Sequence, residues 1–145
     1  MAAAATTVTP ALFMAALRGQ TEKVRQLLAG GANVKGKESS MESMSPLHAA
    51  AYKGHEAMVK MLIKHGAEVS AQDAAGKTAL HYASRRGQAT IVKVLLEHGA
   101  DVSARDGLGK TPAVIAQELG HKQVVDVLFV HSIRLLVSTP SRVCP

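Results

Sequence analysis

A repeat of 33 residues is the sequence feature that most constrains the fold. Written against itself at this period, the chain aligns glycines, valines and leucines in three copies each. The aligned residues are Gly54, Gly87 and Gly120; Val59, Val92 and Val125; and Leu62, Leu95 and Leu128. A weaker, earlier copy has its glycine, Gly19, 35 residues before Gly54. Because no unit can bury its apolar side alone, the repeat predicts a stack of four units with one continuous core.

Each unit has the pattern helix, turn, helix, loop. In the third copy, Thr78 precedes an apolar stretch and can cap a short first helix. Gly87 is expected to end that helix, since the position after a helix favours a residue with positive φ. Apolar residues from Ile91 to Leu96 then form one stripe of a second helix, which Gly99 closes. The following "ADVSARDGLGK" has the turn-forming residues of a projecting loop.

The composition agrees with packed helices. Hydrophobic residues make up 47% of the chain, but aromatic residues only 3%, and tryptophan is absent. A core of Ala, Leu, Val, Ile and Met suits helices at close approach, whereas a barrel or sandwich asks for alternating β-branched and aromatic residues. The sequence therefore predicts an all-α repeat solenoid.

Two stretches carry a family resemblance, "SPLHAAAYKGHEAMVKMLIKHGA" from Ser45 and "TALHYASRRGQATIVKVLLEHGA" from Thr78. Both resemble ankyrin repeats, whose signature is T-P-L-H-x-A. The likeness is strongest over 44–109 and weaker over 10–34 and 110–129, where "TPAVIAQELG" lacks the Leu-His pair. The resemblance implies stacked helix-turn-helix repeats with projecting β-hairpin-like fingers. It also implies non-catalytic protein binding through a concave groove formed by the finger tips and the first helices.

The predicted domain covers residues 10–137, between a flexible N-terminal tail at 1–9 and a C-terminal tail at 138–145. Its repeats are expected at 10–43, 44–76, 77–109 and 110–137.

The sequence argues against secretion and membrane insertion. Cys144 is the single cysteine, so an internal disulfide framework is excluded and a reducing compartment fits. No apolar run reaches the roughly 20 residues of a membrane helix, and the N-terminal "MAAAATTVTP" does not have the pattern of a secretory signal. We expect an intracellular protein, cytoplasmic or nuclear.

The histidines could suggest metal binding or acid–base catalysis, but their positions in the repeat predict structural roles. His48 and His81 occupy the histidine of the repeat signature, which the resemblance assigns to hydrogen bonding between units. His65 and His98 end second helices, where a partly cationic side chain suits the helix dipole. No cysteine or carboxylate cluster completes a zinc set, and "GLGK" at 107–110 lacks phosphate-loop spacing. We therefore predict no catalytic residues, no metal, no cofactor and no small-molecule substrate.

The net charge of +6, with a pI near 9.7, is expected to gather on one face. Residues just before each helix-turn glycine and at the finger tips should look into the groove. The predicted protein-binding positions are Arg18, Tyr52, Lys53, Lys77, Arg85, Arg86, Arg105, Leu108 and Lys110. Glu42 and Glu118 oppose this charge toward the ends. The pattern predicts a partner protein with an acidic segment; the alternative is that these cations only keep the surface soluble.

Other interpretations of the function stay open. The chain could be a regulatory or targeting domain of an enzyme or nuclear complex, a shortened isoform of a longer ankyrin-repeat protein, or a structural spacer. Nucleic-acid binding is disfavoured, because the chain has only two Tyr and two Phe and no base-stacking cluster.

The C-terminal end departs from the repeat. Ser132 stands where a glycine is expected, and Ile133, Leu135, Leu136 and Val137 have no following unit to cover them. Either the last helix lengthens and folds back, or the segment is a second binding site, or the array is cut short.

Overall fold

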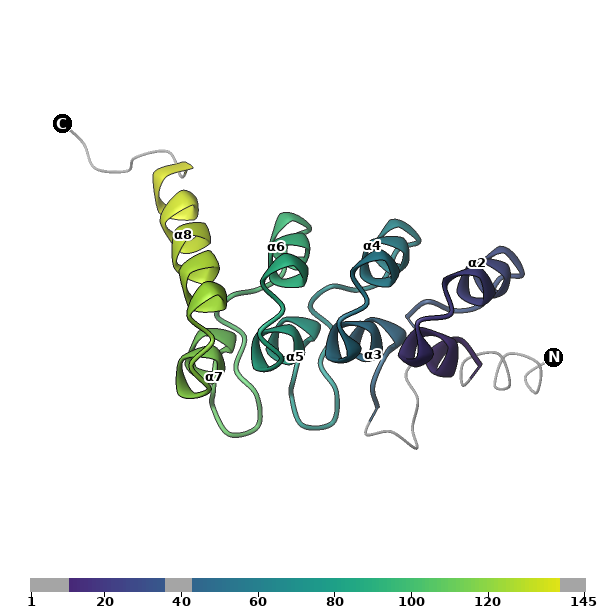
Figure 1. The fold of residues 1–145 in the computed structure, drawn as a ribbon, viewed down its shortest axis with the longest axis horizontal. Coiled ribbons are helices and arrows are strands. Elements are labelled where there is room, and N and C mark those ends of the chain that lie inside the picture. Colours follow the sequence, from purple (N-terminus) through teal and green to yellow (C-terminus); the bar gives the residue numbers. More distant parts are fainter. Residues whose placement is uncertain (1–10, 36–42, 139–145) are drawn as a thin grey trace.

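The computed structural model describes residues 11–35 and 43–138, with side chains described up to Leu135. The helices of the described residues are arranged as pairs, which stand side by side in a row from the N-terminal to the C-terminal end (Figure 1). Residues 11–18 form the first helix, which carries no label. The labelled helices are α2 (Thr21–Ala29), α3 (Pro46–Lys53), α4 (Glu56–Lys64), α5 (Ala79–Arg85), α6 (Ala89–Glu97), α7 (Pro112–Glu118) and α8 (Lys122–Ser138). The described residues contain helices and loops without an extended strand, so the predicted all-α solenoid is confirmed. The predicted N-terminal tail lies outside these residues, as does nearly all of the C-terminal one.

Polar residues cap the start of α3, α5 and α7, and a glycine follows the end of each of these helices. Thr78 Oγ1 accepts a hydrogen bond from the His81 backbone N–H, and the His81 ring accepts one from the Thr78 N–H. Ser45 and His48 form the same reciprocal cap on α3. This pair of bonds satisfies two donors that a helix start otherwise leaves unpaired. Gly54 and Gly87, with φ of 79° and 71°, then turn the chain into the second helix.

The same histidines join neighbouring units. Because Nδ1 of His48 accepts the Ser45 N–H, its Nε2 carries the proton and donates to the Lys77 carbonyl at 2.9 Å. His81 donates to the Lys110 carbonyl in the same way, at 3.0 Å. The structure therefore confirms the expected hydrogen bonding between units. In the last unit Val114 replaces the histidine, and only the Thr111 cap remains.

A second set of histidines ties the helix turns of the second and fourth units to the unit before each. His121 Nε2 lies 2.9 Å from the Arg85 carbonyl oxygen, and His55 Nε2 lies 3.3 Å from that of Leu17. The rings sit against the glycines of the preceding turn. A Cβ added at Gly87 would lie 2.7 Å from His121 Nδ1. Glycine is therefore needed at Gly87 for close packing as well as for its backbone angle.

One apolar core runs the length of the stack. Leu80, Ile91 and Leu95 are fully buried, and the corresponding residues of the second unit, including Leu47, Met58 and Leu62, are buried with them. Alanines such as Ala50 and Ala83 are completely buried between the first helices, where a small side chain permits close approach. The repeats thus share a single seam of side chains.

The fingers are tight loops closed by aspartates. Asp73 Oδ1 accepts the N–H groups of Ala75 and Lys77, and the Asp73 N–H donates to the Lys77 carbonyl. Asp106 repeats this arrangement with Leu108 and Lys110. The N–H of Gly107 donates to the Ala75 carbonyl at 2.7 Å, which links one finger to the next. The hairpin-like fingers are therefore built by side-chain capping of a turn rather than by paired strands.

The last helix is much longer than its counterparts. α8 has 17 residues, whereas α2, α4 and α6 have nine each. It continues without interruption past the end of α6 (Figure 1), so the helix lengthens and does not reverse within the described residues. The outer side of α8 is exposed to solvent. Phe129 on this side is 64% exposed, whereas Leu96, its counterpart in α6, is 5% exposed.

Candidate protein-interaction surface

We use the name finger face for the loops between α4 and α5 and between α6 and α7 together with the exposed ends of α3, α5 and α7. In Figure 1 the loops project beyond these three helices, on the side away from α4, α6 and α8. The finger face carries most of the predicted binding positions. Tyr52, Lys53, Arg85 and Arg86 lie at the ends of the first helices, and Lys77 and Leu108 come from the fingers.

Two tyrosines make the centre of this face. The rings of Tyr52 and Tyr82 meet edge to face, with centroids 6.0 Å apart. Arg86 lies 5.2 Å from the centre of the Tyr52 ring, and Lys53 lies 5.7 Å from it. Lys77 lies 5.8 Å from the centre of the Tyr82 ring. The cations are therefore held against aromatic rings, where each contact contributes about 0.5–1 kcal/mol at an exposed site.

Tyr82 was not among the predicted site residues. It occupies the inner-helix position of Ala49 and Ile115, and it is buried. Its hydroxyl donates to Asp73 Oδ2, which anchors the finger to α5. The sequence did contain a signal for this anchored finger, namely the aligned aspartates Asp73 and Asp106. An acidic residue at a constant place before each finger predicts a capped turn.

A hollow of about 250 Å³ lies on the finger face between the third and fourth units. Tyr82 and Ile115, both mostly buried, contribute to its lining. Leu108 and Leu119 also line it and are themselves 80% and 53% exposed. Lys77 and Arg85 add positive charge.

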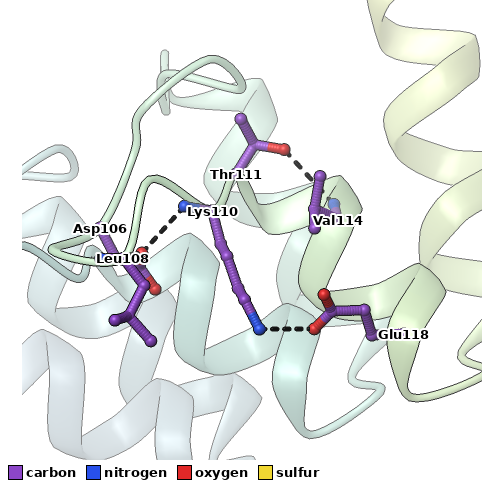
Figure 2. A network of polar contacts seen from close by, with 6 residues as sticks. All are labelled: Asp106, Leu108, Lys110, Thr111, Val114 and Glu118. Atoms are coloured by element: carbon purple, nitrogen blue, oxygen red, sulfur yellow. Dashed lines mark hydrogen bonds and ion pairs between the residues drawn. The ribbon is translucent and has the colours of Figure 1, made fainter.

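Lys110 is neutralised on this face. Its Nζ lies 2.8 Å from Glu118 Oε2, so the lysine reaches from the finger across to α7 (Figure 2). Glu118 was expected to oppose the positive charge only toward the end of the groove. The pair instead offsets the charge of Lys110 on this face.

Asp106, in the finger between the third and fourth helix pairs, stays ionised. Burial acts to raise the pKa of the Asp106 carboxyl, but N–H donors from Lys110 and Leu108, together with nearby His81 and Lys77, hold the pKa below its usual value. Its charge is directed at backbone N–H groups, as Figure 2 shows for Lys110. For His81, burial favours the neutral ring over the cation and lowers the pKa below its usual value. Both groups therefore serve the structure.

The remaining predicted positions lie apart from the hollow. Arg18 is exposed at the end of the first helix, and Arg105 is exposed at the base of the finger. Neither lines the hollow. Glu42, which was expected to oppose the positive charge toward one end of the groove, lies outside the described residues.

The histidines that end second helices bond within their own helices. His65 Nδ1 lies 2.9 Å from the Met61 carbonyl oxygen, and His98 Nδ1 lies 2.8 Å from that of Val94. Among the described side chains, no three His, Cys, Asp or Glu residues gather as a metal site. Within residues 11–35 and 43–138, no helix combines the length and apolar character needed to cross a bilayer.

Comparison with known families settles the relationship that the repeat suggests. The family model for ankyrin repeats, which describes three copies, matches residues 12–106 and again 71–139. The chain belongs to the ankyrin repeat family. Ankyrin repeats are generally protein–protein interaction modules, and the family is generally non-catalytic.

Individual ankyrin relatives are matched over short stretches. Human Rabankyrin-5 is 46% identical over 50 residues, which is 34% of this chain and 4% of the relative. A Caenorhabditis elegans homolog of transient receptor potential cation channel subfamily A member 1 is 38% identical over 61 residues, 42% of this chain and 5% of the relative. The Schizosaccharomyces pombe ankyrin repeat-containing protein P1E11.10 is 31% identical over 74 residues, covering 51% of this chain and 35% of the relative. The chain thus spans only a small part of these proteins.

Proposed function

We propose that this ankyrin repeat chain is a non-catalytic binding module whose finger face captures an acidic segment of a partner protein. The module would act as an adaptor, scaffold or inhibitor in the cytoplasm or nucleus. The observation that carries the proposal is the cluster of Lys53, Lys77 and Arg86 around two tyrosine rings, with Arg85 beside it.

This cluster has the composition of an interface centre. Tyrosine and arginine are enriched at the residues that dominate binding energy. Arg85 and Arg86 project from the end of α5 and are exposed, so a carboxylate can reach them without rearrangement. Complementary charge would raise the association rate, and this gain would shrink as salt is added.

The test is affinity capture from a cell lysate with the full chain and two charge-reversed variants. Arg85→Glu with Arg86→Glu changes the finger face. Lys64→Glu with Lys93→Glu makes the same change of charge at exposed positions on α4 and α6. Circular dichroism should show equal helicity for all three proteins.

We expect the captured proteins to be acidic in their bound segments, to be lost with the Arg85 and Arg86 variant, and to be retained with the Lys64 and Lys93 variant. Equal capture by all three proteins would remove the proposal. Mass spectrometry of the captured proteins also decides the alternative role, because a regulatory or targeting domain should retain an enzyme as its main partner.

A further inference from the structure

We propose that the hollow between the third and fourth units receives one large apolar side chain of the acidic partner segment. This inference rests on the proposed function and specifies the ligand of the same face: an acidic peptide with an apolar anchor, such as Leu, Met or Phe.

The hollow has the size of a side-chain pocket. Its volume of about 250 Å³ lies below the roughly 300–1,000 Å³ of sites for small molecules. The mostly buried Tyr82 and Ile115 line it together with the exposed Leu108 and Leu119. An apolar group placed among them would withdraw from water together with the two leucines.

The leucines are specific to this place in the stack. In the preceding unit, the positions equivalent to Leu108 and Leu119 hold Ala75 and Arg86. Leu108 is 80% exposed at the tip of a finger whose geometry is fixed by Asp106, so its side chain is held out toward a partner. A partner that covers this leucine removes its apolar surface from water, which favours binding.

The charges around the hollow select the neighbours of the anchor. Lys110 is paired with Glu118, and Asp106 Oδ1 accepts backbone N–H groups. Lys77 and Arg85 also line the hollow, and Arg86 lies next to Arg85 in the sequence. Carboxylates flanking the anchor would therefore meet positive charge.

A phage-displayed random peptide library selected on the full chain tests the inference. We expect peptides rich in Asp and Glu that share a large apolar residue at one fixed position. In fluorescence anisotropy with the best synthetic peptide, Leu108→Ser should weaken binding about tenfold, since Leu108 loses its burial. Replacing the peptide's apolar residue by Ser should weaken binding similarly, and the two changes combined should cost less than their product, because both remove the same contact.

The matched control is Phe129→Ser, which removes an exposed apolar side chain from α8. It should leave peptide affinity unchanged. Acidic peptides without an apolar preference, or full affinity of the Leu108→Ser protein, overturn the anchor and leave the proposed function standing. Selected peptides that are not acidic and bind equally to the Arg85→Glu and Arg86→Glu variant, or a failure to enrich any peptide, overturn both.

Discussion

Replacing Gly87 and Gly120 by alanine separates local backbone strain from packing between repeats. The two glycines occupy the same position in consecutive units, with φ of 71° and 76°. Their surroundings differ, because only Gly87 has a further unit packed against it. A Cβ on Gly87 meets His121 Nδ1 at 2.7 Å, whereas a Cβ on Gly120 meets nothing within 4 Å.

The expected losses can be worked out from these contacts. Holding alanine at positive φ costs about 1–2 kcal/mol, and about 0.4–1 kcal/mol of this is offset because alanine restricts the unfolded chain. Gly120→Ala should therefore destabilise the protein by about 1 kcal/mol. Gly87→Ala must also displace the His121 ring from the Arg85 carbonyl, and that hydrogen bond contributes about 1 kcal/mol more.

Urea unfolding followed by circular dichroism gives both free energies of unfolding. The expected losses are about 2 kcal/mol for Gly87→Ala and about 1 kcal/mol for Gly120→Ala. His121→Ala supplies the control, since in that background the two glycine substitutions should cost the same. Equal losses in the native background would refute the packing of His121 between units.

Three further perturbations test other parts of the structure. Ser84 is buried, and its hydroxyl has no hydrogen-bond partner within the described part of the chain. Ser84→Ala should therefore raise the free energy of unfolding by about 1 kcal/mol and the melting temperature by roughly 3 °C. A lower melting temperature would contradict this. Leu96 is 5% exposed, whereas Phe129, its counterpart on α8, is 64% exposed. In urea unfolding, Leu96→Ala should therefore lower the free energy of unfolding by about 2–5 kcal/mol and Phe129→Ala by less than about 1 kcal/mol. Similar losses would mean that the outer side of α8 is buried. Burial lowers the pKa of His81 in the folded protein, so its contribution to stability is complete above pH 6.5 and should diminish as pH falls below 6.5, where the unfolded chain takes up the proton first. His81→Gln should reduce this dependence of the free energy of unfolding on pH, and an unchanged dependence would disprove the assignment.

Much of the fold follows from the sequence because its determinants are local. Thr78 and Gly87 mark the start and end of a helix through contacts within a few residues, and the structure places α5 between them. The stripe from Ile91 to Leu96 is buried as its spacing predicts. Periodicity captures such features because each unit repeats the same short-range interactions.

The finger face was less predictable, because its details depend on contacts between units. The repeat places Tyr82 on an inner helix position, but its hydroxyl reaches Asp73 only because the finger folds back over α5. The ion pair of Lys110 and Glu118 joins a finger to the end of α7. A count of charges along the sequence does not show that the two side chains meet. Tail boundaries at 1–9 and 138–145 remain predictions.

We expect recognition to take place on the finger face, with α4, α6 and α8 as its support. Backbone chemical-shift mapping, with the full chain titrated by the selected acidic peptide, measures this directly. We expect the largest shifts in the fingers around Asp73 and Asp106 and at the ends of α3, α5 and α7, with small shifts elsewhere. Largest shifts on α4 and α6, or along the exposed side of α8, would contradict the account.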